Sequence, residues 1–295
     1  MLLRLAPVLF VLLWSTGFIG SKVVGNHAEP FTVLSLRFAL ALAVLAPVAW
    51  FTPRVTARAA RDAAISGALI HTAYIGGVLW ALREGMPAGL VAIVVCLQPV
   101  LTALLAGPLL GERIGPRNWA GLAIGLAGVA LVVAPKLAAS ASAAHLAGAS
   151  SPMSVVAALA GLVGITLGTL WQKAHGHTGD LRTLTFWQYV GAVGVALPLA
   201  ALLETMHVDW TMEFALAMAW LVLVLSIGAI GLLMLLIRAS AVSRVTSLFY
   251  LVPAVTALMA WVYFGERLTL SQLAGMALVM LAVLMIGSLR SETRG

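Results

Sequence analysis

Apolar runs of about twenty residues follow one another along almost the whole chain, and short stretches between them carry the charges. A bilayer core needs roughly 20 apolar residues per helix, so runs of this length indicate membrane-spanning helices. Only 9% of the residues are charged, whereas a soluble domain carries about 25%. The sequence therefore predicts an all-α integral membrane protein. The runs divide into ten predicted spans, over residues 5–25, 31–50, 63–82, 87–105, 119–135, 153–173, 183–203, 214–237, 245–264 and 270–289.

The orientation of these spans follows from the basic residues, which concentrate in cytoplasmic loops. With the N-terminus inside, 12 of the 17 basic residues fall in cytoplasmic segments and three in outer segments, while Lys22 and Arg37 lie within spans. This distribution predicts that both the N- and C-termini are cytoplasmic. Because the basic residues are scattered singly between apolar runs, they form no patch for nucleic acid, and no such partner is expected.

The second half of the chain repeats the first. At an offset of 151 residues, Lys22 matches Lys173 and Arg37 is replaced by Gln188. The chain therefore divides into a five-helix unit at 1–135, an Ala/Ser-rich outer linker at 136–152 and a second five-helix unit at 153–295. The matches at an offset of 154 are Pro99 with Pro253, Gly111-Glu112-Arg113 with Gly265-Glu266-Arg267, and Ala120-Gly121 with Ala274-Gly275.

Five spans is an odd number, so the second unit is expected to be inverted relative to the first. Inverted repeats are the usual construction of secondary transporters, whose halves rock about a site near the membrane midplane. Glu112 and Arg113 then face the cytoplasm, while Glu266 and Arg267 face outside. Each glutamate is expected to cap a helix end or to pair with its neighbouring arginine, and a gating role is the alternative.

Two features resemble the EamA-type branch of the drug/metabolite transporter superfamily, and the aromatic amino-acid exporter group within it. They are the stretch LWSTGFIGSKVVGNHAEPFTVLSLRFALAL at residues 13–42 and the pattern Pro…Gly-Glu-Arg…Ala-Gly that closes each half. The resemblance covers essentially the whole chain. It implies a multi-pass protein of the cytoplasmic (inner) membrane that carries small metabolites, often outward, with little or no gradient coupling. The expected partners are a small-molecule substrate and the bilayer. No cofactor or metal is expected, and the oligomeric state stays open, with a monomer plausible.

Polar side chains at membrane depth are candidates for the substrate site, because burying them is costly. His71, near the middle of the third span, could bind a substrate carboxylate or amine, or a neighbouring helix. Arg37 lies about 9 Å inside the second span by helical rise. It could hold a carboxylate, but a structural role, reaching outward or pairing at the rim, is the favoured interpretation. The residues expected to bind substrate are Trp14, Ser15, His71, Tyr74, Gln98, Thr166, Gln188 and Tyr250.

Pro99 and Pro253 occupy matching positions in the fourth and ninth spans. A proline inside a helix removes one backbone hydrogen bond and kinks the helix, leaving a carbonyl four residues earlier without its donor. Matching interruptions in the two halves point to a transporter site. The two prolines are therefore expected to act as hinges, and packing alone is the alternative.

The sequence favours a facilitator, exchanger or weakly coupled exporter of aromatic or other apolar amino acids. No Asp or Glu falls in the middle of a predicted span, so strong proton coupling would have to use His71. An exporter of drugs, nucleosides or sugar derivatives is an alternative substrate class. A channel is disfavoured by the shortage of embedded charge. A membrane enzyme acting on lipids would need catalytic groups at one face, where WQKAHGHTGD offers His175, His177 and Asp180; such a polar loop is usually only a loop, and no enzyme is expected.

Overall fold

The computed structural model describes residues 2–98, 100–102, 104–105, 116, 119–121, 123–131, 151–175, 179–229, 232 and 251–287. Five predicted features lie outside these described residues: Pro99, Glu112, Arg113, Tyr250 and nearly all of the 136–152 linker. The described helices are α1 (Leu2–Gly25), α2 (Pro30–Trp50), α3 (Ala57–Gly67), η1 (Ala68–Ala73), α4 (Tyr74–Arg83), α5 (Ala88–Val95), α8 (Pro152–Ala174), α9 (Leu181–Leu203), α10 (Met212–Ala219), η2 (Trp220–Ala229), α13 (Val252–Phe264) and α14 (Leu270–Gly287), where η marks a π-helix.

The described part of the chain is helical, with one isolated β-bridge between Ala28 and Val208. Six helical stretches within it are long and apolar enough to cross a bilayer: α1, α2, α3-η1-α4 as one stretch, α8, α9 and α10-η2 as one stretch. Four shorter apolar helices, at Ala88–Thr102, Trp119–Leu131, Val252–Phe264 and Leu270–Ala282, overlap the remaining predicted spans. The all-α membrane class is thus confirmed, while ten membrane crossings remain a prediction.

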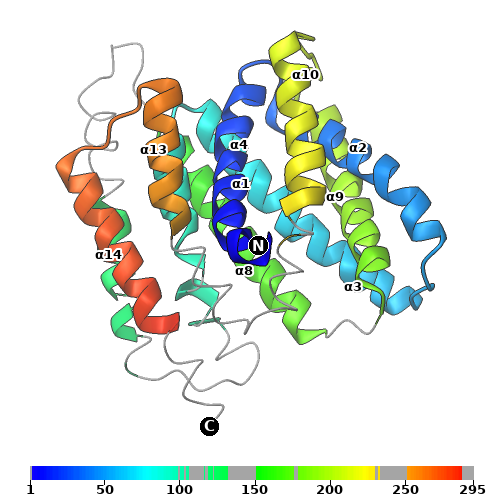
Figure 1. The fold of residues 1–295 in the computed structure, drawn as a ribbon, viewed down its shortest axis with the longest axis horizontal. Coiled ribbons are helices and arrows are strands. Elements are labelled where there is room, and N and C mark those ends of the chain that lie inside the picture. The colour runs from blue at the N-terminus through cyan, green and yellow to red at the C-terminus, as the bar shows by residue number, and fades with distance from the viewer. Residues whose placement is uncertain are drawn as a thin grey trace.

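Helices α2 and α9, which occupy the same place in the two halves of the sequence, pack against each other in opposite directions. At one end, Glu204 after α9 accepts hydrogen bonds from the first turn of α2. At the other end, the hydroxyls of Thr52 after α2 and Thr183 at the beginning of α9 lie 2.6 Å apart. Each helix therefore begins where the other ends. In Figure 1 this pair lies on the opposite side of the molecule from α13 and α14, with α1 between them.

The two halves also contact each other in matching ways. Helix α1 of the first half packs against α10, η2 and α13 of the second half. Helix α8, its counterpart in the second half, packs against α4, η1 and α5 of the first half. Helices α5 and α13, a further matching pair, contact each other directly. Exchanging the halves therefore preserves the pattern of helix neighbours.

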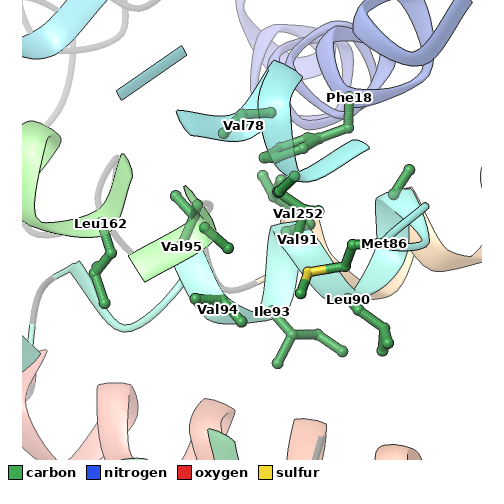
Figure 2. Packing of buried hydrophobic residues seen from close by; sticks show 14 of the residues in the cluster. Phe18, Val78, Met86, Leu90, Val91, Ile93, Val94, Val95, Leu162 and Val252 are labelled. Atoms are coloured by element: carbon green, nitrogen blue, oxygen red, sulfur yellow. The ribbon is translucent and has the colours of Figure 1, made fainter. Parts of the chain in front are cut away.

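Helix α5 forms the centre of the larger apolar core. All eight of its residues are buried, which is what a helix that is apolar on every side requires. Figure 2 shows Phe18 of α1, Val78 of α4 and Val252 of α13 on the side of α5 that carries Val91, with Leu162 of α8 beyond Val95. The turn before α5 contains Gly85 at φ +84°, so the helix ends at Arg83 and a new one begins at Ala88, as the predicted break between the third and fourth spans requires.

Four polar residues join α2 to the end of α9 and are termed here the outer clasp: Glu29, Thr32, Glu204 and Thr205. Glu204 accepts bonds from the N–H groups of Phe31 (2.8 Å) and Thr32 (2.7 Å). Glu29 accepts reciprocally from the N–H and hydroxyl of Thr205, at 2.6 and 2.9 Å. Burial raises the pKa of Glu29, but the bonds from Thr205 and the charge of Arg83 together outweigh it and leave this pKa below its usual value. The loops that meet here are those predicted to share the outer face.

We expect Glu204→Gln to destabilise the protein by about 1–2 kcal/mol. The first N–H groups of a helix lack intrahelical partners, and the helix dipole favours negative charge beside them. A glutamine keeps the shape of the side chain but removes its charge and points an amide donor at other donors. We therefore expect a loss of stability similar to that of losing a helix cap. Thermal unfolding in detergent measures the change. Glu213→Gln, at an exposed carboxylate, is the matched control and is expected to stay within about 0.5 kcal/mol; equal shifts in the two variants would rule out the capping role.

Candidate substrate site

Four helices, two from each half, bring buried polar side chains together near the middle of the molecule. We call these residues the Arg37 cluster: Arg37 on α2, His71 on η1, Tyr189 on α9 and Ser226 on η2. The Arg37 Nε donates to Ser226 Oγ at 3.2 Å, and the Tyr189 hydroxyl donates to the Ser226 carbonyl at 3.3 Å. Ser226 of η2 is therefore bonded to a side chain of α2 and to a side chain of α9.

His71 lies flat against Tyr189 within this cluster. The two ring centroids are 4.8 Å apart with an interplanar angle of 14°, and Phe38 lies 5.7 Å from both rings. His71 is only 8% exposed, and its Nε2 has no hydrogen-bond partner. Buried polar atoms are normally satisfied, so an orphaned one in a native site calls for an explanation such as an unbound ligand. Whether His71 binds substrate or only a neighbouring helix therefore stays a prediction, and its Nε2 is the atom that a ligand would meet.

Both π-helices of the described chain contribute to the cluster. η1 carries His71 and interrupts the third predicted span, while η2 carries Ser226 and lies in the eighth, its counterpart in the second half. π-Helical turns are rare and occur often at functional sites, because the widened turn re-aims side chains. Thr72 of η1 also donates to the carbonyl of Ala192 on α9 at 2.8 Å. The irregular segments of both halves thus meet at one place.

Arg37 carries the charge of this site. It is 8% exposed, so it neither reaches the membrane surface nor pairs at the rim, as the sequence interpretation allowed. Among the described residues, no carboxylate lies within ion-pair distance of it. Its charge acts on three neighbouring groups: His71, Tyr74 and Tyr189. The predicted residues Tyr74 and Gln188 therefore belong to this region, since Gln188 also interacts with the His71 side chain.

Four other predicted substrate residues are bonded elsewhere. Ser15 is fully buried and its hydroxyl reaches the Val252 carbonyl of α13 at 3.5 Å. Thr166 donates to the carbonyl of Leu162 in its own helix, and Gln98 donates to Thr169. Trp14 packs against Phe10 and borders both apolar cores. None of these bonds involves the Arg37 cluster, so these residues border the interior without completing one polar site.

Pro253 lies in the first turn of α13, whose described residues begin at Val252. A proline is tolerated at such a position, because the missing N–H has no partner within the helix. The hinge at Pro253 stays a prediction, since the residues before Leu251 lie outside the described part of the chain. The preceding Phe249, whose carbonyl the prediction freed, lies outside the described residues.

The three residues of the second Gly-Glu-Arg tripeptide, at 265–267, each have a different role in the structure. Gly265 ends α13 in the left-handed conformation, with φ +67°, which glycine adopts without strain. Glu266 forms an ion pair with Lys22 of α1 and accepts from the N–H of Ala88 at 3.3 Å, whereas Arg267 is exposed. Glu266 therefore pairs with Lys22 rather than with Arg267, and it accepts from the first turn of α5 rather than from the helix that it follows.

Sequence reasoning missed the Lys22–Glu266 pair. Lys22 was placed within the first span without a partner, whereas its ammonium contacts Glu266 and lies 4.4 Å from the centre of the Phe264 ring. One signal was available: Lys22 and Glu266 each have a match in the other half, Lys173 and Glu112. A pair of opposite charges that is duplicated together is a reason to expect contact.

A cavity of about 610 Å³ lies apart from the Arg37 cluster. Its walls are one side of α2, from Thr32 to Ala39, one side of α9, at Val193 and Leu197, and the segment 206–210. Ala39 and Leu197 are exposed, so the cavity opens sideways toward the surface that lipid covers. None of the predicted substrate residues lines it. The buried charge and the orphaned His71 nitrogen therefore locate the polar site better than this mainly apolar groove does.

Comparison with known sequences identifies the family. The profile of the EamA-like transporter family matches residues 4–134 and again residues 152–288. The chain belongs to the EamA-like transporter family. The two matched ranges fall on either side of the predicted linker.

Relatives of this EamA-like transporter extend over nearly its whole length. The "Probable amino-acid metabolite efflux pump" of Salmonella typhimurium is 28% identical, covering 92% of this chain and 90% of its own. The "Uncharacterized inner membrane transporter YedA" of Escherichia coli is 27% identical, covering 97% and 91%. A solved structure titled "Crystal structure of protein" matches with a TM-score of 0.60 at 18% identity, covering 98% of each chain, and supports the fold alone. The EamA-like transporter is thus a multi-pass inner-membrane protein.

Family membership also bears on the enzyme and metal alternatives. At the level of the family, the protein is a transporter rather than an enzyme. In the loop between α8 and α9, Asp180 accepts bonds from Arg182, which hold its pKa at about 2, and His175 stacks on Trp171 at 3.8 Å. His177 lies outside the described residues. Across the residues that are described, no group of three metal-ligating side chains comes together.

Proposed function

We propose that this EamA-like transporter moves amino acids, aromatic or otherwise apolar, and related compounds out of the cytoplasm by alternating access. The single observation that carries the proposal is the Arg37 cluster, a buried polar site built by two helices from each half. Substrate sites of repeat-built transporters lie at the interface of the repeats. The relative named as a probable amino-acid metabolite efflux pump supports the same substrate class.

We further propose that the two halves are inverted five-helix repeats with both termini in the cytoplasm. The opposite directions of α2 and α9 support this arrangement, because matching helices of inverted repeats run antiparallel. The exchange of helix neighbours between α1 and α8 supports it as well. The boundaries at 1–135 and 153–295, and the direction of transport, belong to this proposal.

The Lys22–Glu266 pair supports a closed face in the described conformation. It joins α1 of the first half to the segment between α13 and α14 of the second. Both residues lie on the face that the basic residues predict to be outer. A carrier that opens to that face must separate these segments, so we propose that Glu266 contributes to the outer closure while Arg267 does not.

Counterflow in liposomes tests the amino-acid assignment. We expect purified protein, preloaded with unlabelled amino acids, to exchange labelled phenylalanine and leucine faster than empty liposomes do. His71→Ala is expected to slow exchange by about 10-fold, because a buried ring that stacks on Tyr189 and offers an unbonded nitrogen is removed. His207→Ala, at an exposed histidine, is the matched control and is expected to leave exchange unchanged.

Two results would change this proposal. If no amino acid exchanges above the empty-liposome rate, the amino-acid assignment is wrong and drugs, nucleosides and sugar derivatives are the next substrates to measure. If His71→Ala and His207→Ala exchange equally well, the carrier assignment stands but His71 has no part in its pathway.

A further inference from the structure

Within the described residues, Arg37 is a buried charge without a counter-charge. Its guanidinium lies in the middle of α2 at 8% exposure, between α2, η1, α9 and η2. Buried charges in membrane proteins are normally paired, and an ionisable residue that faces the bundle interior marks a pathway or a ligand site. Within the described part of the chain, the groups around Arg37 are hydroxyls, aromatic rings and an imidazole, none of which is an acid.

The hydrogen-bonding capacity of Arg37 is also mostly unused. A guanidinium has five N–H donors. Among the described residues, only its Nε–H has an acceptor, the hydroxyl of Ser226. That bond fixes the orientation of the guanidinium plane and leaves the Nη donors available. Two parallel Nη–H or Nε–H bonds are the geometry in which arginine binds a carboxylate.

The two halves differ at this position. The repeat places Gln188 where the first half has Arg37. The positive charge of Arg37 therefore has no counterpart at the matching position of the second half. A ligand with one carboxylate fits one guanidinium, whereas a phosphate dianion would call for a second cation. The cations nearest to Arg37 in the sequence are Lys22, which pairs with Glu266, and Arg54, which is exposed.

The surroundings of Arg37 define the rest of the ligand. The rings of His71 and Tyr189 stack on each other, and the ring of Phe38, next to Arg37 in the sequence, packs against both at a tilt. Aromatic rings favour offset stacking or edge contacts with another ring. The unbonded Nε2 of His71 supplies one further polar contact among these rings. The site therefore combines a single cation, one orphaned nitrogen and an aromatic wall.

We infer that Arg37 anchors the carboxylate of the transported substrate, which is a monocarboxylate bearing an aromatic or apolar side chain. This inference rests on the proposed transport function and names the chemical group that its site selects. The stacked His71 and Tyr189 rings fill the space beside the guanidinium in the described conformation. Binding therefore requires η1 and α9 to separate, as a site between two rocking halves must do.

A ligand series separates the carboxylate from the rest of the substrate. Phenylalanine, 3-phenylpropionate and phenethylamine share one ring and differ only in carrying the carboxylate, the amine or both. We expect phenylalanine and 3-phenylpropionate to raise the Tm of the purified wild-type protein, and phenethylamine to have little effect. Arg37→Gln is expected to weaken binding of both carboxylates by about 10-fold or more, as for loss of a charge-assisted hydrogen bond. Arg58→Gln, which removes the same charge at an exposed position, is the matched control.

The outcomes distinguish this inference from the proposed function. Equal binding of phenethylamine to the wild type, no binding of any of the three ligands, or undiminished binding of the carboxylates to Arg37→Gln would each overturn the inference. If Arg37→Gln also exchanges phenylalanine at the wild-type rate in liposomes, the carrier stands without the anchor. If the carboxylates bind through Arg37 but no counterflow occurs, the anchor stands and the transport proposal fails. If Arg37→Gln does not fold, the wild-type ligand series decides.

Discussion

Gly191→Val is expected to abolish the packing of α9 against α3 and to leave little folded protein. A Cβ at Gly191 would lie well inside 3.0 Å of the backbone carbonyl of Ala64, and a Cβ at Gly67 would lie as close to the carbonyl of Gln188. These two contacts lie together where α3 packs against α9. Small residues are what allow membrane helices to approach so closely.

The cost is large because the clashing atoms belong to the backbone. Overpacking a core normally costs about 1–3 kcal/mol, since side chains can rotate away. No rotamer relieves a contact with a backbone carbonyl, so the helices must separate and we expect a loss at or beyond the upper end of that range. The Arg37 cluster would be lost as well, because α9 carries Tyr189.

Gly194→Val is the matched control for Gly191→Val. Gly194 lies on the same helix, and nothing comes within 4 Å of a Cβ built there. The two variants have the same change in helix propensity, so only packing separates them. Size-exclusion profiles and thermal unfolding in detergent measure the outcome. Similar losses in both variants would mean that α3 and α9 do not approach each other as the structure has them.

Glu266→Gln and Lys22→Met are each expected to destabilise the protein by about 3 kcal/mol. Removing one partner of a buried ion pair costs about 3–5 kcal/mol, because the other charge is left uncompensated. The lower end applies here, since the side chain of Lys22 is 26% exposed and that of Glu266 is 11% exposed. Glu266 also caps α5 through the Ala88 N–H, so Glu266→Gln loses a helix cap as well.

A charge exchange tests whether the pair itself is responsible. The double variant Lys22→Glu, Glu266→Lys should recover part of the lost stability but not all of it, because the contact of Lys22 with Phe264 and the cap on Ala88 are not restored. Arg267→Gln, next in sequence and exposed, is expected to change stability by less than about 0.5 kcal/mol. Thermal unfolding of the purified variants is the measurement. If the double variant is less stable than both Lys22→Met and Glu266→Gln, the two side chains are not coupled.

Part of the candidate site could be predicted from the sequence, and part could not. His71, Tyr74 and Gln188 were identified because polar residues stand out in apolar spans, and all three lie near Arg37 in the structure. Ser226 and Tyr189 were missed, since a serine and a tyrosine are common in membrane helices and carry no local mark of a site. The two π-helices that bring His71 and Ser226 together have no sequence signature among Val, Leu and Ala residues.

The membrane class, the approximate helix positions and the repeat are local properties, and the sequence by itself determined them. Hydrophobic length is set by the thickness of the bilayer, and a repeated motif is visible at a fixed offset. The tertiary structure alone decided that Arg37 is buried, that Lys22 meets Glu266 and that Pro253 lies in the first turn of α13. The reason is that lipid and protein interior are both apolar, so an apolar helix face does not reveal in its sequence which of the two it contacts.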